Sequence, residues 1–203
     1  MQRKLRLTAQ LAICLWLASC PLAHAESSDN QLHFRGGLVS GNFSGAADSS
    51  TGNFSIANSI DIEYELIRAR NLSFLIRTIF SYDLKFAVLP YAYSGIGLRY
   101  FLWSNSRGYD ESQDGIQIKK KPNLKFYLGP EIGVSEAIVR QYTDVVQTTT
   151  ALAEVGGNLG AVYQINNNLG IETQVGYSMG FGLSTVIVGA TLFKAFLGLG
   201  VYF

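Results

Sequence analysis

The sequence predicts an all-β fold: an eight-stranded antiparallel up-and-down transmembrane β-barrel, preceded by a cleavable signal peptide. Three observations carry this prediction. The chain ends with an apolar residue at every second position, earlier segments repeat the same alternation, and the N-terminus has the composition of a secretory leader. The length agrees, because the 178 residues that follow the leader, 26–203, suffice for one domain.

The leader is predicted over residues 1–25. The segment Arg3–Arg6 is positively charged, the run Leu7–Ser19 is apolar, and Ala23-His24-Ala25 supplies an A-x-A cleavage site. The mature chain would then be a single barrel domain, residues 26–203.

A competing interpretation of the leader stays open. The tetrapeptide Leu17-Ala18-Ser19-Cys20 resembles a lipoprotein box with Cys20 as the lipidated residue, but Pro21 directly after it favours ordinary cleavage. In ordinary cleavage Cys14 and Cys20 both leave with the leader. The mature chain then has no thiol, which excludes a disulfide, a thiolate metal site and a cysteine nucleophile.

Composition excludes further classes of protein. Without the three bases of the leader the net charge is −2, so no nucleic acid is expected as a partner. The longest uncharged stretch, 173–193, is long enough for a membrane helix, but its four glycines and its polar residues favour two strands and a turn. The sequence has no glycine-rich phosphate loop, no HExxH motif and no metal-ligand cluster, so no cofactor and no metal are predicted.

Eight segments alternate with the period of a strand, and each is near the roughly 9–11 residues that a tilted strand needs to cross a membrane. In chain order, the spans and their apolar series are 31–43 with Leu32, Phe34 and Leu38; 56–67 with Ile60, Ile62 and Tyr64; 72–85 with Leu72, Phe74 and Ile76; 92–103 with Ile96, Leu98 and Tyr100; 123–135 with Leu124, Phe126 and Leu128; 151–164 with Val155, Leu159 and Tyr163; 169–181 with Ile171, Val175 and Tyr177; and 193–203 with Phe193, Leu197 and Leu199.

Charged residues within these spans fall on the opposite parity. If the apolar parity faces lipid, where a Lys or Arg at the midplane would cost about 2–4 kcal/mol, the charges lie inside the barrel and must be paired. The sequence therefore predicts a lumen filled by an ion network. The predicted members are Arg35, Glu63, Arg77, Arg99, Lys125, Glu131, Glu154, Glu172 and Lys194.

The connections predict an orientation. With an even number of strands both termini lie in the periplasm, where short turns are expected around 69–71 and 166–168, both containing Asn. The connection 104–122 departs from this rule, because it is long and polar yet too short for two more spanning strands. The extracellular loops are expected at about 44–55, 86–91, 136–150 and 182–185.

Aromatic residues predict two girdles at the membrane surfaces. Trp103 is expected near the periplasmic interface, and Tyr82, Phe86, Tyr91 and Tyr93 near the outer one.

The last apolar residues are Phe203, Val201, Leu199 and Leu197, and this series resembles the C-terminal assembly signal of bacterial outer-membrane barrels. With the leader and the eight segments, the mature chain resembles the small barrels of the OmpA/OmpX-like superfamily. The resemblance implies a bacterial outer membrane, with lipid and lipopolysaccharide around the barrel and the barrel-assembly machinery as a partner during biogenesis. It also implies a monomer, but it does not fix a function, because this architecture hosts many.

Three functional hypotheses follow. The leading one is a non-enzymatic barrel with a structural or surface-interaction role, in which the longest loop, Glu136–Thr150, contacts the environment. The second is a narrow channel or small-molecule transport barrel, for which lumenal glycines such as Gly95 and Gly97 would leave room. The third is a lipid A-modifying enzyme with His33, the one histidine of the mature chain, as its general base. No catalytic residue is predicted, since no motif supports the third.

Overall fold

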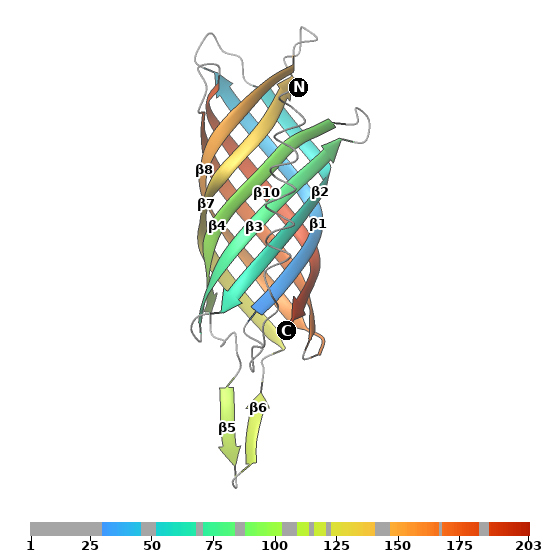
Figure 1. The fold of residues 1–203 in the computed structure, drawn as a ribbon, viewed down its shortest axis with the longest axis vertical. Coiled ribbons are helices and arrows are strands. Elements are labelled where there is room, and N and C mark those ends of the chain that lie inside the picture. The colour runs from blue at the N-terminus through green and yellow to red at the C-terminus, as the bar shows by residue number, and fades with distance from the viewer. Residues whose placement is uncertain are drawn as a thin grey trace.

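The computed structural model is a closed β-barrel. It describes residues 30–45, 52–67, 71–83, 88–102, 109–113, 116–120, 123–140, 147–166, 168–182 and 187–203, so the predicted leader lies outside the described residues. Around the barrel the strands follow the order β1-β10-β9-β8-β7-β4-β3-β2, and all neighbours are antiparallel (Figure 1). The predicted fold class, an eight-stranded antiparallel up-and-down barrel, is confirmed.

The barrel strands have 12 to 18 residues each. Their bounds are β1 (Asn30–Gly45), β2 (Gly52–Ile67), β3 (Leu72–Asp83), β4 (Val88–Leu102), β7 (Leu124–Arg140), β8 (Gln147–Gln164), β9 (Leu169–Gly182) and β10 (Ile187–Tyr202). We call the end at which β1 begins and β10 ends the base, and the opposite end the top. No described helix is long and apolar enough to cross a membrane.

The turn between β8 and β9 closes tightly at the base, as the asparagines predict. The backbone N–H of Ile165 donates to the carbonyl of Leu169 at 2.9 Å, and the N–H of Asn168 donates to the side-chain oxygen of Asn166 at 2.9 Å. This Asx bond is the local reason for asparagine at the position.

The strands extend farther at the top than the sequence predicts. The expected loops 44–55, 86–91 and 136–150 are wrong in part, because each strand continues into the range predicted as loop. In particular, β7 and β8 stay paired from Leu124 opposite Tyr163 up to Arg140 opposite Gln147. The antiparallel partner supplies the ladder hydrogen bonds, so pairing does not need the membrane and persists beyond the roughly 9–11 residues that span it.

The exterior of the barrel is apolar, as the alternation predicts. Along β9 buried and exposed residues alternate without interruption from Gly170 to Phe181. On β10 the same rule separates Leu197, which is 59% exposed, from its neighbour Phe196, which is 5% exposed. An apolar surface of this kind is stable when it faces lipid, and the closed sheet leaves no unpaired strand edge in the hydrocarbon.

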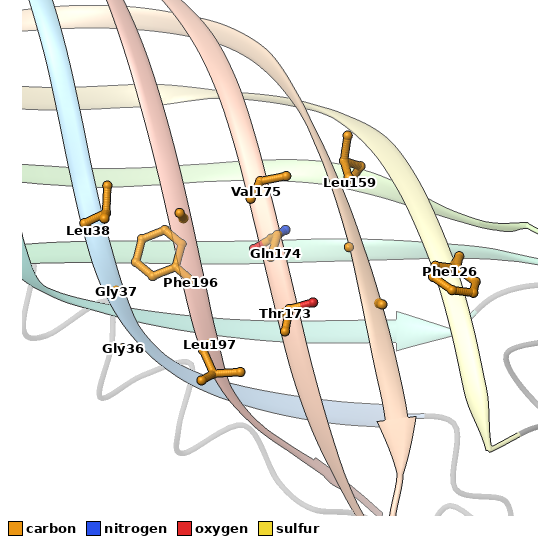
Figure 2. Close-up of a pocket in the computed structure, with 13 residues that line it drawn as sticks. Gly36, Gly37, Leu38, Phe126, Leu159, Thr173, Gln174, Val175, Phe196 and Leu197 are labelled. Atoms are coloured by element: carbon orange, nitrogen blue, oxygen red, sulfur yellow. The ribbon is translucent and has the colours of Figure 1, made fainter.

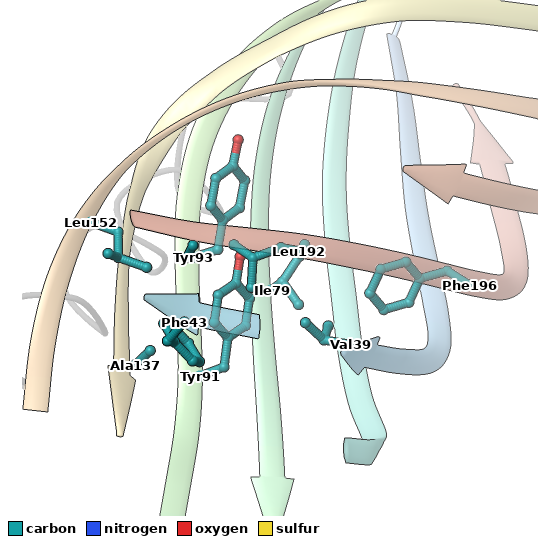
Figure 3. Close-up of a cluster of buried hydrophobic side chains, with 10 residues drawn as sticks. Val39, Phe43, Ile79, Tyr91, Tyr93, Ala137, Leu152, Leu192 and Phe196 are labelled. Atoms are coloured by element: carbon teal, nitrogen blue, oxygen red, sulfur yellow. The ribbon is translucent and has the colours of Figure 1, made fainter. Parts of the chain in front are cut away.

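The described side chains of the lumen form three layers. Nearest the top is an apolar layer, here called the septum, which is drawn in Figure 3. Its members are Val39, Phe43, Ile79, Tyr91, Tyr93, Ala137, Leu152, Ala190, Leu192 and Phe196. Below it lies a layer of buried charges, and near the base a small second cluster is formed by Phe101, Tyr127, Val162 and Tyr202, here called the base cluster.

The seam between β1 and β10 closes the barrel. At the base, the N–H of Asn30 donates to the carbonyl of Phe203 at 3.3 Å, and the N–H of Phe203 donates to the carbonyl of Asn30 at 3.1 Å. Midway along the seam the two backbones approach closely, because a Cβ added to Gly37 would lie 2.8 Å from the Cα of Phe196. A Cβ on the adjacent Gly36 would meet nothing within 4 Å.

The long connection between β4 and β7 contains a separate hairpin. Strands β5 (Tyr109–Gln113) and β6 (Ile116–Lys120) form a two-stranded sheet of their own, and Figure 1 shows them beyond the base of the barrel. The sequence correctly predicts that this segment adds no spanning strand, and it does not predict the hairpin.

Candidate functional site

The layer of buried charges is the candidate site. It consists of twelve ionisable side chains that point into the lumen and are at most 4% exposed, here called the charged layer. They are His33, Arg35, Asp61, Glu63, Glu65, Arg77, Arg99, Lys125, Glu131, Glu154, Glu172 and Lys194. They come from all eight barrel strands, because each strand presents every second residue to the lumen.

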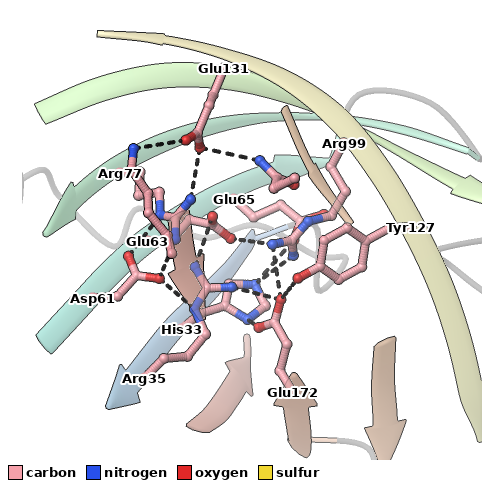
Figure 4. A network of polar contacts seen from close by, with 12 residues as sticks. His33, Arg35, Asp61, Glu63, Glu65, Arg77, Arg99, Tyr127, Glu131 and Glu172 are labelled. Atoms are coloured by element: carbon pink, nitrogen blue, oxygen red, sulfur yellow. Dashed lines mark hydrogen bonds and ion pairs between the residues drawn. The ribbon is translucent and has the colours of Figure 1, made fainter. Parts of the chain in front are cut away.

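Glu172 on β9 is the centre of the lower half (Figure 4). One of its oxygens accepts from Arg35 at 2.7 Å and from Arg99 at 3.0 Å, and it also accepts the Tyr127 hydroxyl. Its other oxygen lies 2.6 Å from Nδ1 of His33. A single carboxylate therefore links β1, β4, β7 and β9.

Arg99 on β4 holds three carboxylates. Besides Glu172, its guanidinium donates to Glu63 and to Glu65, each at 2.5 Å. The same group lies over the ring of Tyr127, with 3.9 Å from Cζ to the ring centroid. A planar guanidinium suits this position, since it can donate along several directions and stack on an aromatic face at once.

Asp61 connects the lower and upper halves. One of its oxygens lies 2.8 Å from Nε of Arg35, and Arg77 donates to both of its oxygens at 2.9 Å. Arg77 then reaches upward and donates to Glu131 at 2.7 Å. The ion pairs thus form one continuous chain along the barrel axis.

Lys194 on β10 completes the upper half. Its ammonium lies 3.2 Å from Glu131 and 3.0 Å from Glu154. Glu154 also accepts from the hydroxyls of Tyr91 at 2.9 Å and of Ser178 at 3.0 Å. These bonds tie the charged layer to the lower surface of the septum.

The contacts given above join eight of the nine network residues predicted from sequence. The ninth, Lys125, is also buried in the lumen and lies toward the base, with its ammonium 5.9 Å from the ring centroid of Tyr202. Sequence reasoning left His33, Asp61 and Glu65 out of the network. The signal was present, since they share the parity of Arg35 and Glu63 on their strands.

The predicted outer girdle is wrong for two residues. Tyr91 and Tyr93 are buried inside the lumen as septum members, because they share the parity of Arg99 on β4. Tyr82 does lie on the exterior, at 41% exposed. Trp103 and Phe86 lie outside the described residues.

Two adjoining hollows mark the lipid-facing exterior. One, of about 530 Å³, runs across β1, β10, β9, β8 and β7, and small residues such as Gly36, Thr173 and Ala195 leave room between Leu38, Phe126 and Leu197 (Figure 2). The other, of about 510 Å³, shares Leu159 and Val175 with it. Their lining is almost entirely apolar, which suits hydrocarbon rather than a polar substrate.

The charged layer offers a metal or a substrate little access. The ligand atoms of His33, Glu63 and Glu172 lie within 4.8 Å of one another, a spacing that could hold an ion. In this structure, however, Arg35 and Arg99 already donate to both carboxylates. The cationic partners of these acids are therefore arginines.

Lys194→Leu is expected to lower the free energy of unfolding by about 3 kcal/mol, because it leaves Glu131 and Glu154 with less positive charge in a buried site. Urea unfolding in detergent, followed by heat-modifiable gel migration, measures this change. The control is Phe193→Leu on the adjacent, lipid-facing position, for which little change is expected. Stabilisation by Lys194→Leu would instead indicate a lysine that faces lipid.

No family model matches the chain, and no curated protein matches it. Solved structures do. Neisserial surface protein A (NspA) has a TM-score of 0.52 and 16% identity over 86% of this chain and 97% of its own. The N-terminal β-barrel domain of Pseudomonas aeruginosa OprF gives 0.48 and 10%, over 86% and 98% of the two chains. Ail, the attachment invasion locus protein of Yersinia pestis, gives 0.47 and 9%, over 86% and 99%. The likeness to NspA shows a shared fold.

Proposed function

Because the chain has the fold of the small eight-stranded outer-membrane barrels, we propose that it is a non-enzymatic, non-conducting barrel of the bacterial outer membrane with a structural or surface-interaction role. The observation that carries the proposal is the charged layer, whose ion pairs join all sides of the lumen. Eight strands enclose a space just wide enough for side chains, and here large side chains occupy it.

The proposed orientation places the base in the periplasm and the top outside the cell. The longest strands of the barrel are β7, with 17 residues, and β8, with 18 residues, and their paired ends form part of the top. About 9–11 residues cross the membrane, so this pair would project well beyond the lipid. A rigid projecting hairpin is suited to surface contacts, because little ordering entropy is lost on binding.

The proposed partners are those of an integral outer-membrane barrel. Lipid and lipopolysaccharide would contact the apolar exterior. The assembly machinery would bind the terminal series Leu197, Leu199, Val201 and Phe203, whose side chains all point outward. The protein itself is proposed to be a monomer.

The surroundings of His33 support a non-enzymatic role. The ring is fully buried, with Nδ1 2.6 Å from Glu172 and Nε2 3.1 Å from Glu65. A general base needs a free nitrogen within reach of the proton that it removes. Carboxylates face both nitrogens of His33, so the ring is held as part of the network.

The lumenal glycines, which favoured a channel, are explained by neighbouring side chains. A Cβ on Gly95 would lie 2.6 Å from Cζ of Tyr93, and one on Gly200 would lie 2.9 Å from Nδ1 of His33. These glycines make room for large lumenal side chains rather than for a solute. This supports the closed barrel over a narrow channel or transport barrel.

Single-channel recording in planar bilayers tests the closed lumen. The purified protein is expected to give no steady conductance above that of a bilayer treated with detergent alone. A steady, reproducible conductance step would overturn the proposal and favour the narrow channel.

Epitope insertion tests the surface role and the orientation. A tag inserted between Arg140 and Gln147 is expected to bind antibody on intact cells, because this position follows the projecting ends of β7 and β8. The matched control is the same tag between Asn166 and Asn168 at the base, which should bind only after the outer membrane is broken. The reverse result would contradict the orientation.

A further inference from the structure

We propose that the septum, and not the charged layer, is the barrier that keeps water and ions at the top of the barrel from entering the lumen. This inference rests on the proposed closed lumen and identifies the layer that closes it at the top. The two layers would then have separate roles, since the septum excludes solvent and the charged layer holds the strands together.

Side chains from around most of the barrel meet in the septum. Its ten members come from six strands, β1, β3, β4, β7, β8 and β10, and form one contact cluster with no charged side chain. The remaining two strands complete the layer. On β2, the hydroxyl of Ser59 forms a hydrogen bond of 2.7 Å with the hydroxyl of Ser81. On β9, Gly180 leaves room for Leu152, because a Cβ added to this glycine would lie 3.2 Å from Cδ1 of Leu152.

Tyr91 and Tyr93 form the lower surface of the septum. Figure 3 shows their hydroxyls pointing in the same direction. Tyr91 donates to Glu154 at 2.9 Å, and the Lys194 ammonium lies 4.0 Å from the Tyr93 ring centroid. The rings therefore pack with apolar side chains of the septum and also contact charged groups of the layer below.

The two layers act differently on an ion that enters the lumen. An apolar constriction expels water and blocks ions without any charge. A layer of fixed ion pairs is different, because water can solvate and loosen it once water reaches it. On β10 the septum residues Ala190 and Leu192 lie between the top and Lys194, so the ion pairs keep their low-dielectric surroundings only while the septum is intact.

A thiol at Gln174 can measure this seal. Gln174 is 2% exposed, lies opposite the septum residue Phe196 on β10, and neither atom of its amide has a hydrogen-bond partner among the described residues. Gln174→Cys therefore breaks no ion pair. In a chain with Cys14→Ala and Cys20→Ala it supplies the single thiol, here called the lumen probe, and its reaction with a small cationic methanethiosulfonate in detergent reports access to the lumen.

The variant that opens the septum is Leu192→Ala, and its matched control is Leu197→Ala, the same change on the lipid face of the same strand. Leu192→Ala is expected to speed the reaction of the lumen probe at least about tenfold, the factor that about 1.4 kcal/mol of opening free energy produces. Leu197→Ala should leave the rate unchanged. Lys194→Leu should also leave it near the parent rate, because it removes a charge below the rings of Tyr91 and Tyr93 and none of the apolar side chains of the septum.

Three outcomes would overturn the inference. An unchanged rate with Leu192→Ala would exclude the septum as the seal, and equal acceleration by Lys194→Leu would give that role to the ion pairs. Acceleration of a second probe, Val162→Cys in the base cluster, by Leu192→Ala would indicate opening of the whole barrel. A lumen probe that already reacts like an exposed thiol in the parent barrel would instead overturn the closed lumen of the proposed function.

Discussion

Arg99→Met is expected to lower the free energy of unfolding by about 5 kcal/mol, the upper part of the range for breaking a buried ion pair. The side chain is fully buried and donates to Glu63, Glu65 and Glu172. Its loss leaves three carboxylates short of positive charge where little solvent reaches them. Urea unfolding in detergent, with heat-modifiable migration as the readout, measures the change.

The control for this prediction is Leu98→Met, which introduces the same residue at the adjacent position on the lipid face. A volume-conserving apolar change of this kind costs less than about 1.5 kcal/mol. A second arm combines Arg99→Met with Glu65→Gln. Part of the loss should be recovered, because one unpaired acid is removed. Equal stability of Arg99→Met and Leu98→Met would show that the network does not hold the barrel together.

Gly37→Val is expected to prevent closure of the barrel, and Gly36→Val to leave it intact. An added Cβ at Gly37 would overlap the carbonyl oxygen of Ala195 and lie 2.7 Å from Cδ1 of Phe196, and most of this obstruction is backbone that cannot turn aside. Overpacking a core costs about 1–3 kcal/mol or more, and here it falls on the seam that joins β1 to β10 and closes the barrel.

The two glycines make a matched pair, because they are adjacent on β1 and the same side chain is added to each. The measurement is the fraction of protein that shows the compact, heat-modifiable band after refolding into detergent. Gly36→Val should match the parent, and Gly37→Val should give little compact band. Comparable yields from both variants would show that the seam tolerates extra width at Gly37.

The fold could be predicted because alternation is a local property of the chain. One residue in two must face lipid, so the exterior positions of Leu159, Ile171 and Leu197 can be assigned from their immediate neighbours in the sequence. The positions of Glu172 and Lys194 inside the lumen follow from the same parity. The partners of these charges do not, because they depend on the register between strands far apart in the sequence.

The septum could not be predicted by charge alone. Val39, Ile79 and Leu192 are apolar yet lie on the lumenal parity, so a rule that assigned the lumen by its charged residues passed over them. The same omission placed Tyr91 and Tyr93 in an aromatic girdle. Counting every residue by parity, apolar ones included, would have identified the layer.

The seam has a consequence for the order of folding. Arg35 and Glu172 are 137 residues apart in the sequence, and Asn30 pairs with Phe203 from the opposite end of the chain. Contacts this distant form slowly, because loop-closure entropy is lost before they can contribute. The ion pairs across the seam therefore form last. Until that moment Arg35 lacks Glu172, so an unclosed sheet is the state most exposed to misassembly.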